Sequence, residues 1–270
     1  MIGSGDPPPF TFANSAGRAA LLLVCDHASR AVPRALQSLG LEDSALVRHI
    51  AWDIGAEELT RSLAKRFDAP AVIAGYSRLL IDNNRSLQDT TSIVTSSDGV
   101  VIPANRDLGA SDRERRVRSF FEPYHAAVHE RLEDFRRRAL VPAFLSIHSF
   151  TPVMNGRPRP WQVGVLWDRD PRIAVPLLAR LQASGEVSVG DNLPYSGRHP
   201  ADYTVARHAE RAGLPHVCIE VRQDLIDAPA GVARWSTILA EALTPILADP
   251  HLHKGWRNQD PDEEERMNGA

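Results

Sequence analysis

Runs of consecutive apolar residues recur along the chain, and segments with apolar positions three or four residues apart separate them. The runs fall at 21–24, 71–74, 79–81, 143–147, 162–167 and 216–221. Such runs are typical of strands with two buried faces, as in parallel sheets. The helical spacing predicts helices at 44–49, 56–67, 111–135, 173–181, 201–212 and 232–247. This alternation predicts an α/β fold with a mixed, largely parallel central sheet flanked by helices.

The two ends of the chain differ in composition from its centre. They are polar and rich in proline or charge, which predicts flexible tails at 1–11 and 256–270. No internal repeat or linker divides the remainder, so a single domain is expected at 12–250.

Charge and cysteine content exclude several classes of protein. A formal net charge of −3 gives no electrostatic reason to bind nucleic acid or an anionic membrane. No apolar stretch approaches the roughly 20 residues of a membrane span, and the first nine residues lack the features of a signal peptide. Cys25 and Cys218 both fall in predicted strands and are expected to be buried thiols. We therefore expect a soluble, cytoplasmic protein, with its oligomeric state left open.

Groups that bind metals or transfer protons follow three of the predicted strands. His27 follows the run 21–24, His148 follows 143–147, and Glu220 lies at the end of 216–221. Ligands of open α/β sheets bind beyond the carboxyl ends of the strands. Two imidazoles and a carboxylate at one sheet edge are typical of a catalytic zinc site.

A third metal ligand is needed, and two aspartates are candidates. Asp53 follows an apolar segment and precedes a predicted helix, so it is either a ligand or the N-cap of that helix. Asp26 adjoins His27, and neighbouring strand residues point to opposite faces. We favour Asp53 as the ligand. Asp26 is better suited to holding a metal-binding residue in its orientation without touching the metal itself.

Arginines next to these positions suggest an anionic substrate. Arg85 follows Asn84 at a strand end, and its planar fork matches a carboxylate, although an ion pair with Asp82 is an alternative. Arg222 alternates with Glu220, so the two either share a function or form an ion pair. The long polar loop from Ser86 to Ala110 is a candidate lid.

Other histidines and nucleophiles carry weaker signals. His125 and His129 stand four residues apart without the glutamate of a metalloprotease motif, and they are expected to be ordinary helix residues. His208 is also expected to be structural. No Gly-x-Ser-x-Gly motif supports Ser149 as a nucleophile, and no glycine-rich phosphate loop supports nucleotide chemistry.

Six motifs in order resemble the N-formylglutamate amidohydrolase (N-formylglutamate deformylase) family. They are Cys-Asp-His-Ala-Ser-Arg at 25–30, Ala-Trp-Asp-Ile-Gly-Ala at 51–56, Ser-Arg-Leu-Leu-Ile-Asp-Asn-Asn-Arg at 77–85, Ser-Ile-His-Ser-Phe-Thr-Pro at 146–152, Asn-Leu-Pro-Tyr-Ser-Gly at 192–197 and Ile-Glu-Val-Arg-Gln-Asp-Leu-Ile at 219–226. The resemblance implies a phosphorylase/hydrolase-like fold related to zinc carboxypeptidases. It also implies an enzyme: a zinc-dependent, or other divalent-metal-dependent, hydrolase of an N-acyl amino acid such as N-formylglutamate.

The resemblance also implies roles for the candidate residues. His27, Asp53 and His148 would hold the metal, and Glu220 would take a proton from the attacking water. Arg78 or Arg222 would polarise the carbonyl, while Asn84, Arg85 and Ser149 would bind an acidic small-molecule substrate. Two alternatives remain: a carboxypeptidase-like hydrolase of larger N-acyl or peptide substrates, and a non-catalytic protein that binds an acidic metabolite.

Overall fold

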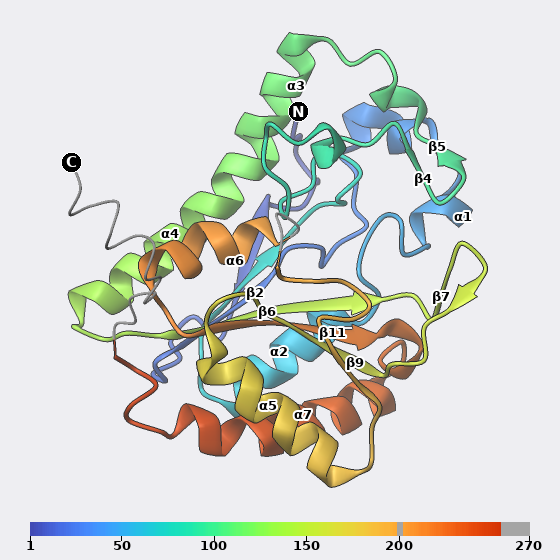
Figure 1. Cartoon of the computed structure of the whole chain (residues 1–270). Helices are drawn as coiled ribbons and strands as arrows, with labels where there is room; N and C mark the ends of the chain where they lie inside the picture. The colour runs from blue at the N-terminus through green and yellow to red at the C-terminus, as the bar shows by residue number, and fades with distance from the viewer. Residues whose placement is uncertain (199–201, 255–270) are drawn as a thin grey trace, which may run out of the picture.

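A seven-stranded sheet forms the centre of the molecule in the computed structural model, which describes residues 1–198 and 202–254 (Figure 1). In spatial order the strands are β1 (Phe10–Ala13), β3 (Ala71–Ala74), β2 (Leu21–Cys25), β6 (Ala143–Phe150), β11 (His216–Arg222), β9 (Val163–Leu166) and β10 (Val189–Asp191). β1 pairs antiparallel with β3, and β9 pairs antiparallel with β11, while the other pairs are parallel. The expected mixed, largely parallel sheet is confirmed.

Helices cover both faces of this sheet. One face packs against α2 (Ala56–Arg66), α5 (Pro171–Ser184) and α7 (Pro229–Leu247), and the other against α4 (Glu122–Arg137) and α6 (Tyr203–His208) (Figure 1). The apolar runs supply both layers, because alternate residues of a strand point to opposite faces. On β6, for example, Leu145 packs toward the first set of helices and Phe144 toward the second. His148 and Glu220 follow the register of Phe144, so both lie on the face that α4 and α6 cover.

The structure differs from the predicted strands and tails at several places. The run 79–81 is not a strand but a buried turn, because the chain leaves the sheet after β3 and packs into a separate cluster under the long loop. β1 and β10 were not predicted, since each is short and lies at an edge of the sheet. β1 begins at Phe10, inside the segment expected to be a tail, while the predicted tail at 256–270 lies outside the described residues.

The long polar loop forms a wall of the cavity, and buried hydrogen bonds hold its base. This wall segment, residues 86–109, contains the hairpin β4 (Ser96–Ser97) and β5 (Val100–Val101). Arg116 of α3 (Ala110–Arg116) is buried, and it donates to Leu80 O at 2.9 Å and to Asn105 Oδ1 at 2.6 Å. α3 begins after Gly109, one residue before the predicted start at Ser111, and a π-helical turn at 117–121 joins it to α4.

The remaining elements are short. α1 (Asp43–Leu46) precedes the loop that enters α2, and the hairpin β7 (Val153–Met154) and β8 (Arg157–Pro158) extends from the end of β6. The predicted helix at 201–212 appears as α6 and a short 3-10 turn, with residue 201 outside the described part of the chain. None of the helices in the described ranges has the length and apolar character needed to span a bilayer.

Candidate active site

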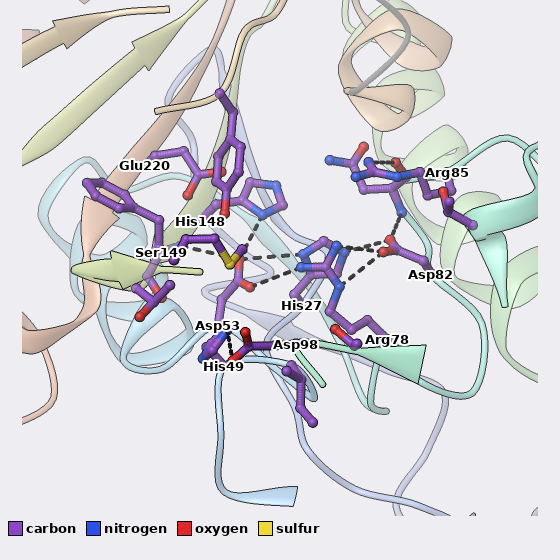
Figure 2. A pocket seen from close by; sticks show the side chains of 18 of the residues that line it. His27, His49, Asp53, Arg78, Asp82, Arg85, Asp98, His148, Ser149 and Glu220 are labelled. Atoms are coloured by element: carbon purple, nitrogen blue, oxygen red, sulfur yellow. Dashed lines mark hydrogen bonds and ion pairs between the residues drawn. The ribbon is translucent and has the colours of Figure 1, made fainter. Parts of the chain in front are cut away.

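A cavity of about 420 Å³ opens at the carboxyl ends of β2, β6 and β11, with the wall segment along one side (Figure 2). Its floor is formed by residues from separate strand ends, which parallel pairing brings to one edge. The residues at its centre are His27, Asp53, Asp82, His148 and Glu220. All of them are at least nine-tenths buried.

His27 stands two residues beyond β2, where the chain has left the sheet. Its Nε2 lies 2.7 Å from Asp82 Oδ1, and because a carboxylate can only accept, the ring donates there. Its Nδ1 is buried, 3.5 Å from Asp53 Oδ2, with no hydrogen-bond partner in the described part of the chain. Burial alone lowers the pKa of His27, but the negative charges of Asp82 and Asp53 outweigh it and raise the pKa above its usual value.

His148 lies within β6, directly opposite Glu220 of β11 in the parallel register. Its Nδ1 is 2.9 Å from Asp53 Oδ2. Its Nε2 is 3.3 Å from Asp26 Oδ2 and 3.0 Å from Ser146 Oγ. Burial opposes a charge on this ring, yet the carboxylates of Asp26 and Asp53 raise its pKa well above the usual value.

Asp53 lies between the two imidazoles. α2 begins at Ala56 with Gly55 as its N-cap, so the carboxylate of Asp53 does not cap that helix. Its Oδ2 instead accepts a hydrogen bond from the backbone N–H of Ser149 at 3.2 Å. Burial alone would raise the pKa of Asp53, but the two adjacent histidines hold it far below its usual range.

The cluster of His27, Asp53 and His148 suits a divalent cation. One ligand atom from each residue lies within 4.8 Å of the others, and the imidazole centroids are 5.0 Å apart. Nitrogen and carboxylate donors in this number match a catalytic zinc site with an open position. Each imidazole also has a carboxylate at its far nitrogen, the arrangement that orients metal-binding histidines. A cation here would give the unpartnered Nδ1 of His27 a partner.

Glu220 is the carboxylate of the site that remains available for chemistry. Its Oε2 is buried and has no hydrogen-bond partner among the described residues. Burial raises the pKa of Glu220 to about 7, and the negative charge of Asp53 acts in the same direction. A carboxylate with a pKa near neutrality is suited to accept and return a proton at physiological pH.

Arg78 contacts two of the carboxylates in the site, those of Asp82 and Asp53. Its Nε and Nη2 donate to Asp82 Oδ2 at 3.0 and 2.7 Å, and its Nη1 lies 3.6 Å from Asp53 Oδ1. Burial would lower the pKa of this guanidinium, but Asp82 and Asp53 raise it, so Arg78 stays charged. Arg78 therefore offsets part of the negative charge that Asp53 and Asp82 place in the cavity.

Asn84 and Arg85 both line the cavity, and Arg85 lies on the side away from Glu220 (Figure 2). The backbone N–H of Asn84 donates to Asp82 Oδ1 at 2.8 Å, and its Oδ1 accepts from the backbone N–H of Thr204 at 2.9 Å. Arg85 donates from Nη1 to its neighbour's carbonyl at 2.9 Å. Both residues are thus held beside Asp82, the carboxylate that His27 contacts.

Two predicted site residues are placed differently from expectation. Arg222 does not line the cavity; β11 ends there, and the following turn brings Asp224 to its guanidinium at 2.8 Å. Of the two arginines expected to polarise a substrate carbonyl, only Arg78 is among the residues that line the cavity. Ser149 lines the cavity, but its hydroxyl donates to Ile54 O at 2.8 Å, so its contribution is the backbone N–H that holds Asp53.

The sequence patterns missed the importance of Asp82, which appeared only as a possible partner of Arg85. The signal was the close spacing of Arg78, Asp82 and Arg85, in which one carboxylate is flanked by two cations. They also missed Tyr195, which lines the cavity. His125 is structural, as expected: its Nε2 donates to Asn83 O at 3.0 Å, and its Nδ1 lies 2.9 Å from His208 Nε2.

Comparisons with known proteins show which family and which solved structures the chain resembles. The model of the N-formylglutamate amidohydrolase family matches residues 19–227. The crystal structure of a gene product from Agrobacterium tumefaciens is similar to this chain, with 32% sequence identity and a TM-score of 0.86. The match covers 91% of this chain and 98% of that chain. The N-formylglutamate amidohydrolase of Ralstonia eutropha JMP134 shares the fold, with 22% identity, a TM-score of 0.67 and coverage of 89% and 97%. No curated protein gives a significant match.

Proposed function

The chain belongs to the N-formylglutamate amidohydrolase family, and we propose that it is a metal-dependent enzyme that removes the acyl group from an acidic N-acyl amino acid such as N-formylglutamate. One observation carries this proposal. The buried cluster of His27, Asp53 and His148 lies beside Glu220, whose Oε2 has no partner among residues 1–198 and 202–254. We place the reaction in the cytoplasm, within amino-acid metabolism.

The metal site is proposed from the donor set. His27 and His148 would each contribute Nδ1 and Asp53 a carboxylate oxygen. When bound, zinc or another divalent cation would act as a Lewis acid toward the amide carbonyl and lower the pKa of water. Asp82 and Asp26 would hold the imidazoles in the required orientation from their far nitrogens.

Glu220 is the proposed general base. It takes a proton from water as that water adds to the amide carbon, and it then delivers the proton to the leaving nitrogen. The C–N bond breaks in the second step, which releases the free amino acid and the carboxylate of the acyl group. Its raised pKa of about 7 suits both steps, because the same group must accept and release a proton.

The proposed substrate spans the cluster between two charged regions. Arg85, beside Asn84, would bind the substrate carboxylate, since a guanidinium fork matches a carboxylate in two hydrogen bonds. Arg78 uses Nε and Nη2 on Asp82, and its Nη1 lies 3.6 Å from Asp53 Oδ1, so we assign only the second N–H of Nη1 to negative charge on the acyl oxygen. The scissile amide would then lie toward Glu220, on the far side of the cluster from Arg85 (Figure 2).

A second candidate is an amidohydrolase of larger N-acyl or peptide substrates. The cavity volume of about 420 Å³ falls within the range of small-molecule sites. Apolar side chains of Phe150, Met154 and Leu166 line part of it, which would accommodate an acyl group larger than formyl.

A substrate screen on metal-replete protein tests the proposal. The purified chain is loaded with zinc, manganese or cobalt, and metal content is measured by mass spectrometry. N-formyl, N-acetyl and N-succinyl derivatives of glutamate, aspartate and leucine are then offered. We expect one cation per chain and fastest turnover of an acidic derivative. A protein that binds no divalent cation and cleaves none of these amides would refute the proposal.

A further inference from the structure

The segment Asn192–Gly197 is built onto the strand next to Glu220. Gly164 of β9 is the antiparallel partner of Glu220. A Cβ at Gly164 would lie 2.3 Å from Leu193 O and 3.5 Å from the Cβ of Glu220. Only glycine permits this approach of backbone to backbone, so the segment rests directly beside the proposed base.

The two ends of this segment are also fixed. Asn192 Oδ1 accepts hydrogen bonds from the backbone N–H of Trp167 at 3.1 Å and of Gly197 at 2.8 Å. A Cβ at Gly197 would lie 2.7 Å from the nitrogen of Trp167, so this end too is in close backbone contact. Tyr195, in the middle of the segment, is thereby held at the cavity.

The hydroxyl of Tyr195 accepts one hydrogen bond and can still donate another. Arg159 donates from Nη1 to the phenol oxygen at 2.9 Å, and its Cζ lies 4.7 Å from the ring centroid. A guanidinium has no acceptor, so the phenol oxygen is the acceptor of this bond. The O–H proton of Tyr195 is left for another partner. Tyr195 is 36% exposed, and its partial burial, together with the negative charge of Glu220, raises its pKa, so the proton stays on the phenol near neutral pH.

We propose that Tyr195 is a catalytic residue whose hydroxyl donates a hydrogen bond to the acyl oxygen of the substrate as water adds to the carbonyl carbon. The inference rests on the proposed amidohydrolase function. If Arg85 holds the substrate carboxylate, the acyl group lies toward Glu220, the side on which Gly164 seats the segment that carries Tyr195. The oxygen gains negative charge as its double bond to carbon becomes a single bond, and an O–H donor held in place stabilises that charge.

The substitution Tyr195→Phe tests this role, because it removes the hydroxyl and keeps the ring. We expect kcat to fall about 100-fold, the order seen when one donor to a developing oxyanion is removed, with little change in KM. Metal content and melting temperature should be unchanged. Tyr203→Phe is the matched control: Tyr203 also accepts a hydrogen bond from an arginine, Arg207, but does not line the cavity.

A binding measurement gives a second readout. The probe is 2-(phosphonomethyl)pentanedioic acid, whose tetrahedral phosphorus stands in place of the attacked acyl carbon of an N-acyl glutamate. Calorimetry on the zinc-loaded proteins should show weaker binding by Tyr195→Phe than by wild type or Tyr203→Phe, by at least 10-fold.

The outcomes separate the two proposals. Wild-type turnover and probe affinity in Tyr195→Phe, alongside an inactive Glu220→Gln, would refute the role of Tyr195 and leave the proposed function standing. A wild-type protein that binds zinc but neither cleaves an N-acyl amino acid nor binds the probe would refute both.

Discussion

His27 Nε2 donates to Asp82 Oδ1 at 2.7 Å, and this bond determines which nitrogen of the ring can bind a metal. With its proton on Nε2, a neutral imidazole has its lone pair on Nδ1, which is the nitrogen that faces Asp53. Arg78 holds the other oxygen of Asp82 through two hydrogen bonds. The orientation of His27 is therefore set by an ion pair outside the proposed metal ligands.

Replacing Asp82 by asparagine should weaken metal binding. His27 and Arg78 donate to different oxygens of Asp82, and asparagine replaces one of these oxygens by an NH2 group, so one donor would face another donor and the imidazole loses its fixed orientation. We expect the dissociation constant for zinc to rise about 10- to 100-fold, measured by competition with a chromophoric chelator. Asp98→Asn is the control, because Asp98 also lines the cavity but pairs with Arg48. Equal zinc affinity in the two variants would contradict the orienting role.

Glu220→Gln should separate chemistry from metal binding. The substitution keeps the shape of the side chain and removes its ability to accept a proton, so we expect kcat to fall by about 10²- to 10⁴-fold. Metal content should stay at the wild-type level, as Glu220 is outside the proposed ligand set. Steady-state kinetics with metal analysis on the same samples provides the check. Unchanged turnover would remove Glu220 from the mechanism.

Arg85→Met should mainly weaken substrate binding. A hydrogen bond to a charged group contributes about 1.5–3 kcal/mol, which corresponds to a rise in KM of about 10- to 100-fold for an acidic substrate. Arg106→Met serves as the control, because Arg106 is exposed and does not line the cavity. Comparison of N-acyl glutamate with its diamide gives the decisive measurement: a charge-specific role predicts that the diamide is affected much less. An equal loss for both substrates would argue for a structural effect.

The buried pair of His125 and His208 should make stability depend on pH. Burial lowers the pKa of His125 to about 4 and that of His208 to about 3, while an unfolded histidine titrates near 6.5. The unfolded chain therefore binds more protons below pH 6.5, and the free energy of unfolding falls as the pH drops from 6.5 toward 4. The loss from His125 is on the order of 3 kcal/mol.

Denaturant unfolding at fixed pH values, with chelator present to exclude metal effects, measures this dependence. The variant His208→Gln removes one titrating ring and keeps an amide that can donate to His125. Its free energy of unfolding should fall less steeply between pH 6.5 and 4 than that of the wild type. Identical slopes would show that this pair does not titrate as its burial implies.

The sequence predicts the sheet and the meeting of polar side chains at its edge, and the reasons are local. The runs that become β2, β6 and β11 are apolar on both faces, and parallel pairing brings their carboxyl ends together. His27, His148 and Glu220 therefore meet as expected. The family resemblance is likewise confirmed by the match over 19–227.

What could not be predicted depends on contacts between distant loops. Asp82 lies in a turn after β3 and reaches His27 only because the run 79–81 leaves the sheet, although its residues are apolar enough to suggest a strand. The strand alternation suggested that Arg222 shares a role with Glu220. The chain turns after Arg222, however, and its guanidinium forms an ion pair with Asp224. Tyr195 enters the site through glycine contacts whose partners are remote in the sequence.

The wall segment has an anchored base and an exposed tip, and this division bears on how the family can change its substrates. Arg116 and Asn105 tie the base to the turn at 79–80, while the tip around Asp98 and Gly99 reaches the cavity mouth on a two-residue turn. Mutations at the tip would change the cavity mouth without loosening the base or disturbing the catalytic cluster. Relatives with other preferences should then vary at 94–101 and retain the arginine–asparagine pair.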